Sequence, residues 1–214
     1  MQKKSTHYEL HKGFLLEQEI KYLHARLNKE IPWTQVKYYK PERGYVITPR
    51  LTWACGFHQK TIYPLMKGMI TPNHIPDWLL PLKHLVEDAT SQHYNFLLFS
   101  KYRNEKDSIT FHSDNERFLG FKPRIASITL GATRPFLLKN KKTKETQTFN
   151  LDAGDLFLMK DNCQRDYLHS VPKQKTTIKE RISITFRKAL NEYGSCNYYM
   201  YNTLQDPLLF KNDD

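Results

Sequence analysis

The sequence predicts an α+β fold in which amphipathic helices precede a β-sandwich or jelly roll. Apolar residues recur at helical spacing in the first half of the chain, which indicates helices with one buried face. After residue 94 the apolar period changes to two, and the strand-like segments are short and separated by turn residues, which is typical of sandwiches and jelly rolls. A chain of 214 residues is expected to form one domain, since domains average roughly 150 residues.

Two helices are expected in the first half of the chain. The first covers residues 15–27 and the second begins at Pro81, a residue that suits the first turn of a helix. The buried stripe of the first is predicted to be Leu16, Ile20, Leu23 and Leu27, and that of the second Leu82, Leu85, Val86 and Ala89. Between them, residues 31–75 are rich in Pro, Thr, Tyr and Trp, and we expect short strands and loops there.

The second half of the chain reads as a series of strands. Their alternating apolar and polar residues predict strands at 95–102, 126–131, 134–139, 147–151, 155–159 and 181–187. The lysine-rich residues 139–146 are expected to form the exposed end of a hairpin. The polar tail, residues 190–214, receives no assignment.

The net charge indicates an anionic partner. Lys and Arg number 33 against 22 Asp and Glu, which gives a formal charge of +11 and suggests a polyanion such as nucleic acid. A soluble enzyme with basic loops is the alternative. Lysines near residues 139–144 and 173–179 are candidates for phosphate contacts, unless they form a solvated face.

Cysteine usage and the absence of apolar runs predict an intracellular protein, nuclear or cytoplasmic and not secreted. Cys55, Cys163 and Cys196 are scattered and odd in number, so we expect reduced thiols rather than a disulfide framework. The first residues lack the apolar segment of a secretory signal, and no run approaches the ~18 residues of a membrane span. We expect a monomer without membrane contact.

A histidine and an aspartate two residues apart suggest a metal site. In an extended segment, His112 and Asp114 project to the same side, so both could reach one ion. His169 is the best candidate for a third ligand, which would complete a facial triad with open coordination positions. The pair alone is weak evidence, because a lone histidine is more often a surface or core residue.

The segment RISITFR strengthens the metal hypothesis. Arg181, Ser183, Thr185 and Arg187 share one face of the predicted strand, and the apolar residues between them occupy the other. Two arginines on an inward face require an anion, because buried charge must be paired. A dicarboxylate would satisfy both guanidinium groups. A pair of salt bridges to acidic side chains is the alternative.

Taken together, these residues resemble the AlkB family of DNA and RNA dealkylating dioxygenases, in particular animal AlkB homologues 2 and 3. The likeness extends from about Ile31 to Ala189. The ordered series of matching stretches is more specific than any one motif. It comprises IPW (31–33), PRLTW with the following glycine (49–56), YRNEKDS (102–108), HSDNE (112–116), IASITLGATRPF (125–136), HSVPK (169–173) and RISITFRK (181–188).

The resemblance implies a double-stranded β-helix core, residues 95–189, with the N-terminal helices packed on its outside. It implies a nucleotide-recognition region at about 31–75. It makes iron(II) the metal and 2-oxoglutarate the cosubstrate. The implied iron ligands are His112, Asp114 and His169; the implied 2-oxoglutarate contacts are Ser100, Tyr102, Arg181, Thr185 and Arg187.

Two details of the cosubstrate site stay open. The sequence does not determine which arginine meets which end of 2-oxoglutarate. The family usually has Asn two residues before the Tyr of the YRN motif, where this chain has Ser100. A hydroxyl can replace only one of the amide hydrogen bonds, which puts the affinity for 2-oxoglutarate in doubt.

The implied reaction is oxidative demethylation of 1-methyladenine and 3-methylcytosine in DNA or RNA, with O2 consumed and formaldehyde, succinate and CO2 released. The damaged base must leave its stack to reach a buried iron, which favours single strands. The candidate substrate contacts are Arg43, Gly44, Tyr63, Asn115 and Glu116. For Tyr63 a packing role, and for Arg43 and Glu116 a surface role, are the alternatives.

Two other functions remain open. A dioxygenase of the same fold could hydroxylate a protein side chain, although the basic charge and YRNEKDS argue against it. A catalytically silent nucleic-acid-binding module would need neither the triad nor the two arginines.

Overall fold

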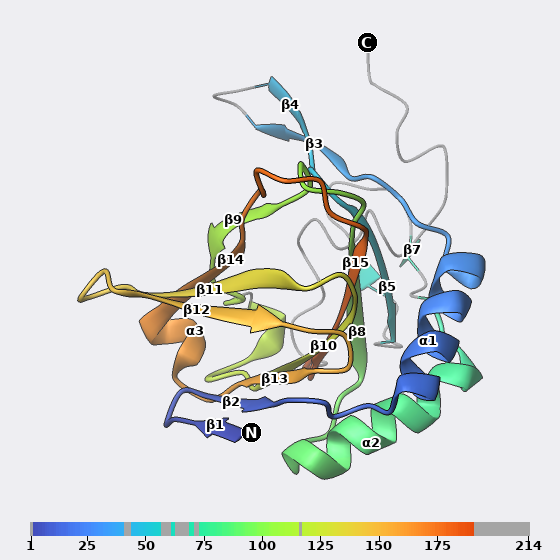
Figure 1. Ribbon diagram of the computed structural model, residues 1–214, viewed down its shortest axis with the longest axis horizontal. Coiled ribbons are helices and arrows are strands. Elements are labelled where there is room, and N and C mark those ends of the chain that lie inside the picture. Colours follow the sequence, from blue (N-terminus) through green and yellow to red (C-terminus); the bar gives the residue numbers. More distant parts are fainter. Residues whose placement is uncertain are drawn as a thin grey trace.

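Two antiparallel sheets face each other in the computed structural model, which describes residues 2–40, 44–56, 61–62, 69–70, 73–115 and 117–190 (Figure 1). The larger sheet contains, in spatial order, β1 (Gln2–Lys4), β2 (Tyr8–His11), β13 (Leu156–Met159), β10 (Ile125–Gly131), β15 (Arg181–Arg187), β8 (Phe96–Tyr102) and β5 (Leu51–Gly56). The smaller sheet contains β12 (Thr146–Leu151), β11 (Arg134–Asn140), β14 (Tyr167–Val171) and β9 (Ile109–His112). Hairpins β3 (Lys37–Lys40) with β4 (Gly44–Ile47), and β6 (Thr61–Ile62) with β7 (Met69–Ile70), stand apart from both sheets.

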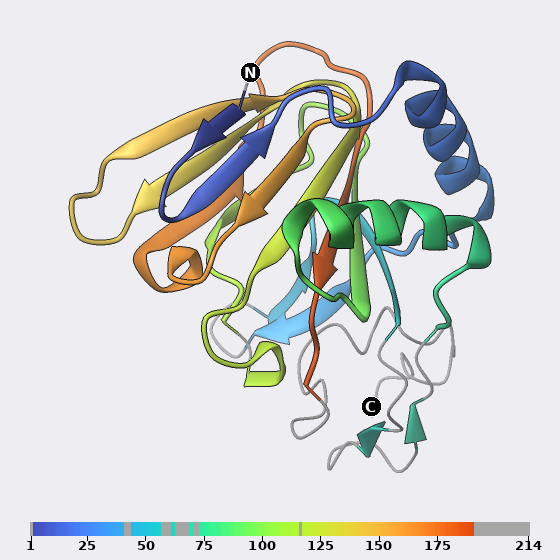
Figure 2. The same ribbon diagram turned by 90° about the horizontal axis from the view of Figure 1, so that it is seen from below.

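The two long helices lie on the outside of the larger sheet (Figure 2). They are α1 (Glu17–Glu30) and α2 (Leu80–Thr90), the latter preceded by the 3-10 turn η1 (Asp77–Leu79). Leu23 and Leu27 of α1 and Val86 of α2 share one buried cluster with apolar residues of β8, β10 and β15. This arrangement confirms the jelly roll with external N-terminal helices.

The predicted helical stripes are partly wrong. Leu16 is 62% exposed because it precedes the first turn of α1, and Leu15 is buried in its place. Leu85 and Ala89 are exposed as well. Helix α2 begins at Leu80, after the η1 turn, and its buried face passes through Leu82 and Val86 as predicted but extends toward Lys83 and Thr90 instead of Leu85 and Ala89. The buried side chains of α2 are Leu82, Lys83, Val86 and Thr90.

A second apolar cluster lies between the two sheets. Phe136 and Leu138 of β11 meet Leu98 of β8 and Phe157 of β13 there. All six predicted strands are confirmed within one or two residues, as β8, β10, β11, β12, β13 and β15. Strands β1, β2 and β14 are not among the predicted ones. The connection between β11 and β12 is exposed, as the lysine-rich sequence predicts.

Two further expectations concern the chain as a whole. Cys55 and Cys163 are buried free thiols, whereas Cys196 and the tail from residue 191 lie outside the described residues. Among the described helices, none has the length and apolarity that crossing a membrane requires.

Candidate active site

Two neighbouring strands of the smaller sheet bring the predicted triad together. His112 ends β9, and His169 on β14 pairs directly with it across the ladder. Asp114 follows two residues later, and the three ligand atoms lie within 4.8 Å of one another. Each histidine Nε2 lies 3.7 Å from one of the two carboxylate oxygens of Asp114. Two imidazole nitrogens and one carboxylate oxygen on one side of a metal ion leave its other positions open.

Both imidazoles are held in the form that binds a metal. Nδ1 of His112 lies 2.8 Å from the carbonyl oxygen of Thr110, so this nitrogen carries the proton and Nε2 is left as a ligand. His169 stacks on Phe136 with ring centroids 5.6 Å apart. Burial lowers the pKa of His169 to about 3, so its imidazole is neutral at physiological pH. Metal binding requires this neutral form.

Asp114 is a buried carboxylate with a cationic neighbour. Burial by itself would raise its pKa, but the positive charge of Arg187 holds the pKa of Asp114 below its usual value. Nη2 of Arg187 donates to the Asp114 carboxylate over 3.0 Å. The backbone N–H of Asp114 donates to Oε1 of Gln164 over 2.9 Å. The carboxylate is therefore ionised and held by Arg187, while Gln164 holds the backbone of Asp114.

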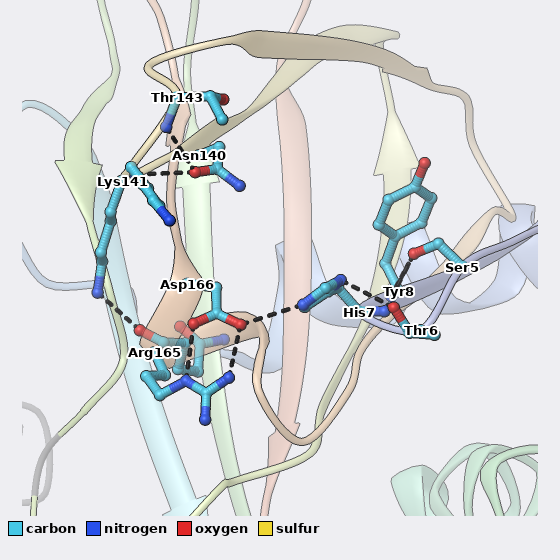
Figure 3. Close-up of polar contacts among 11 residues, drawn as sticks. Ser5, Thr6, His7, Tyr8, Asn140, Lys141, Thr143, Arg165 and Asp166 are labelled. Carbon is cyan, nitrogen blue, oxygen red and sulfur yellow. Dashed lines mark hydrogen bonds and ion pairs between the residues drawn. The ribbon is translucent and has the colours of Figure 1, made fainter.

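Gln164 belongs to the short helix α3 (Cys163–Asp166), which is anchored by charged side chains (Figure 3). Lys141 donates to the carbonyl oxygen of Gln164 over 2.8 Å. Asp166 accepts two hydrogen bonds from Arg165, at 2.7 and 2.9 Å, and lies 3.1 Å from Nε2 of His7. This network keeps Gln164 against the loop of Asp114. The sequence carries no signal for this contact, because Gln164 belongs to no recognisable pattern.

A pocket opens beside the triad between the two sheets. The space between its walls is about 550 Å³ when the open solvent at its mouth is included. The five predicted 2-oxoglutarate contacts, Ser100, Tyr102, Arg181, Thr185 and Arg187, line it together with the triad. The remaining lining residues are Arg50, Leu98, Ile109, Ser127, Phe136, Met159, Val171 and Ser183.

Arg181 is a buried cation with unused hydrogen-bond donors. It is 2% exposed, and its Nη2 donates to the hydroxyl of Thr129 over 3.0 Å. Its Nε and Nη1 are buried and have no hydrogen-bond partner among the described residues. Burial lowers the pKa of Arg181 to about 10, so it remains charged at neutral pH. A carboxylate is the ligand that such a guanidinium lacks.

The two arginines of β15 therefore differ. The alternative of a salt bridge to an acidic side chain holds for Arg187, which pairs with Asp114. It does not hold for Arg181, which forms no ion pair within the described part of the chain. The strand rise of about 3.3 Å per residue puts their Cα atoms about 20 Å apart. Arg187 thus marks the triad end of the pocket and Arg181 the far end.

Sequence analysis missed two buried arginines. Arg134, fully buried, donates to the carbonyl oxygens of Asn104, Asp107 and Pro172 over 2.6–3.0 Å. Its guanidinium carbon lies 5.7 Å from the ring centroid of Tyr102, and that of Arg181 lies 5.4 Å from it. The ring of Tyr102 therefore contacts both cations, and Arg134 fixes the loop that follows it.

Arg50, the other missed arginine, is 5% exposed and lines the pocket just before β5. Strand alternation could have revealed both residues. Arg134 lies two residues before Phe136 and Arg50 lies four residues before Ala54, and both of these apolar residues belong to the cluster between the sheets. Because side chains alternate along a strand, each arginine is expected on the same inward face.

Of the five predicted substrate contacts, the structure describes Gly44 and Asn115. Gly44 begins β4 with a φ of +67°, a conformation that suits glycine. Asn115 is exposed beside Asp114, and neither Gly44 nor Asn115 lines the pocket. Arg43, Tyr63 and Glu116 lie outside the described residues.

Residues 8–187 match the 2OG-Fe(II) oxygenase superfamily, and the chain belongs to that family. Within it, the chain is 35% identical over 187 residues to the alpha-ketoglutarate-dependent dioxygenase alkB homolog 3 of Bos taurus. It is 30% identical over 192 residues to the DNA oxidative demethylase ALKBH2 of Arabidopsis thaliana. These matches cover 82% and 77% of this chain, but only 63% and 60% of the relatives. The predicted resemblance to the AlkB family is confirmed.

Solved structures support the fold. The structure of OsALKBH1 superposes with a TM-score of 0.65 at 18% identity, covering 87% of this chain and 100% of that one. A 2OG-Fe(II) oxygenase family oxidoreductase from Burkholderia pseudomallei gives 0.60 at 12% identity, covering 89% and 90%.

The described residues fit the cofactors that the superfamily's name implies. The triad offers the nitrogen and oxygen donors that suit iron(II). The unused donors of Arg181 suit a carboxylate of 2-oxoglutarate, in the same pocket as the triad.

Proposed function

We propose that the protein is an iron(II)- and 2-oxoglutarate-dependent dioxygenase that demethylates alkylated bases in nucleic acid. One observation carries the proposal. A facial triad shares a pocket with a buried arginine that lacks an anion, in a chain similar to alkB homolog 3 and to a DNA oxidative demethylase.

The triad, the two arginines of β15 and Tyr102 each receive a role in this proposal. His112, Asp114 and His169 hold iron(II), which together with 2-oxoglutarate and O2 supplies the chemistry that oxidises an N-methyl group. Arg181 and Tyr102 bind the carboxylate of 2-oxoglutarate that lies away from the triad. Arg187 keeps Asp114 ionised and in place. The orientation of 2-oxoglutarate thus follows from the different partners of the two arginines.

The proposed substrates are 1-methyladenine and 3-methylcytosine in single strands. Both bases carry positive charge and have lost normal pairing, so they are easier to extrude than intact bases. The net charge of +11 attracts the flanking phosphates. Contacts of Tyr63, Asn115 and Glu116 with the base stay predictions. The products are formaldehyde, succinate and CO2.

A panel of defined lesions tests the substrate. Single-stranded oligonucleotides carrying 1-methyladenine, 3-methylcytosine or neutral O6-methylguanine are incubated with protein, iron(II), ascorbate and 2-oxoglutarate, and then weighed by mass spectrometry. The two cationic lesions should be demethylated and O6-methylguanine left nearly intact. Equal rates on all three, or no turnover of either cationic lesion by iron-loaded protein, would contradict the proposal and favour a protein side chain as substrate.

A further inference from the structure

Phe121 is the most exposed large apolar side chain among the described residues. It is 88% exposed, whereas Phe118 and Leu119 just before it are buried. The ammonium of Lys122 lies 5.0 Å from its ring centroid, and no other ring contact of Phe121 occurs within the described part of the chain. A partner that covered this ring would remove its apolar area from water, which is favourable.

The backbone around Phe121 is strained in a way that presents the ring to solvent. Gly120 has a φ of +73° and Lys122 a φ of +52°, and the second value is unfavourable for a residue with a side chain. A Cβ at position 120 would lie 2.6 Å from Cδ1 of Leu190, and the positive φ itself favours glycine where the turn meets Leu190. A strained backbone conformation of this kind is kept only where the surrounding structure holds it in place.

Cations surround a hollow beside this ring. The hollow has about 670 Å³ of space, open solvent included, and its lining contains Phe121, Lys122, Arg124 and Lys188. Asp161 is the one acidic residue of the lining. Nε of Arg124 is buried without a hydrogen-bond partner, and none of the three cations forms an ion pair with a described residue. The surface therefore offers a ring and positive charge together.

We propose that this surface, defined as Phe121, Lys122, Arg124 and Lys188, binds the single strand of nucleic acid beside the target base. One base stacks on Phe121 and the adjoining phosphates contact the cations, a combination typical of single-strand binding. The inference rests on the proposed function only in taking nucleic acid as the partner.

The position of the surface fits a strand that also enters the active site. Phe121 follows Asp114 by seven residues, which limits their separation to at most about 25 Å. The N–H of Leu190 donates to the carbonyl oxygen of Phe118 over 2.7 Å, so the turn is fixed to the segment that follows β15. Arg187, at the end of β15, contacts Asp114. A strand of a few nucleotides can span this distance.

Binding of an unmodified single strand to the full chain tests the surface without requiring turnover. Phe121→Ala should weaken the Kd by about 30-fold, the middle of the range for one stacked base. Lys122→Gln with Lys188→Gln should reduce the slope of log Kd against log salt by about 1.4, at about 0.7 for each phosphate contact. Tyr22→Ala and Lys29→Gln on α1, both exposed, are the matched controls and should leave Kd and slope unchanged.

Cross-linking locates the contact. Strands with 5-iodouracil at successive positions should, on irradiation, cross-link to Phe121 from one position near the lesion. Wild-type Kd in Phe121→Ala, or cross-links only elsewhere, would overturn the proposal. A Phe121→Ala variant with an altered melting temperature but an unchanged Kd would show that the ring packs against other parts of the protein. That result would also overturn the proposal. Wild-type protein that binds strands at this surface but repairs no lesion would instead contradict the proposed function.

Discussion

Replacing Arg181 by methionine should have opposite effects on stability and on 2-oxoglutarate binding. Without its anion, Arg181 is a buried cation with two unused donors and no acidic partner among the described residues. A pKa of about 10 instead of 12.5 corresponds to a cost of about 3 kcal/mol for keeping the charge buried. Methionine has similar length and no charge, so the protein without ligand should gain about 1–3 kcal/mol once the bond to Thr129 is subtracted.

The same substitution should nearly abolish binding of 2-oxoglutarate. Hydrogen bonds between charged groups contribute about 1.5–3 kcal/mol each, so losing one weakens binding by about 10- to 150-fold and losing two weakens it further. Melting with and without 2-oxoglutarate, with manganese(II) in place of iron, measures both effects. Wild-type protein at a ligand concentration of about 100 Kd should gain about 2.7 kcal/mol, and Arg181→Met should gain almost nothing.

Arg134→Met is the matched control, because Arg134 is equally buried but already bonded to three carbonyl oxygens. Its loss should destabilise the fold by about 2–4 kcal/mol. An Arg181→Met variant that melts as low as Arg134→Met, or that keeps a normal KM for 2-oxoglutarate, would refute the assignment of Arg181 as the carboxylate site.

Other substitutions test the triad and its supports. Asp114→Ala should abolish metal binding and, by removing the carboxylate that pairs with the buried Arg187, destabilise the fold by about 3–5 kcal/mol in urea titrations. Asp114→Ala with Arg187→Met should recover stability but not metal, and a double variant as unstable as the single one would contradict this. Gln164→Met should lower metal affinity about 10- to 100-fold in calorimetry while the fold persists. Ser100→Asn should lower the KM for 2-oxoglutarate several-fold, through one hydrogen bond of about 1 kcal/mol; an unchanged KM would argue against it.

The sequence was most informative where a strand has two different buried faces. In β15, Ile182, Ile184 and Phe186 face the helices while Arg181 and Arg187 face the pocket, and simple alternation predicts both. The spacing of His112 and Asp114 also predicts that both side chains point to one metal ion, because residues two apart in an extended segment share a side.

Prediction failed where the local backbone departs from a regular repeat. Apolar spacing predicts Leu85 in the buried stripe of α2, but the helix packs through Leu82, Val86 and Thr90 and leaves Leu85 39% exposed. Gln164 could not be found, since a contact across 50 residues through one side chain leaves no periodic trace. The alternation of β11 predicts that Arg134 points inward, but it does not show that the guanidinium group is bonded to backbone carbonyl oxygens.

The amount of succinate formed per base repaired tests the central claim most directly. Protein with iron(II), 2-oxoglutarate and a single strand carrying 1-methyladenine is sampled over time, and succinate and unmethylated adenine are quantified together. The account predicts that both rise in equal amounts, and that neither forms in His169→Ala, which lacks one triad ligand. Succinate that accumulates at the same rate with and without the methylated strand, while the base stays methylated, would contradict it.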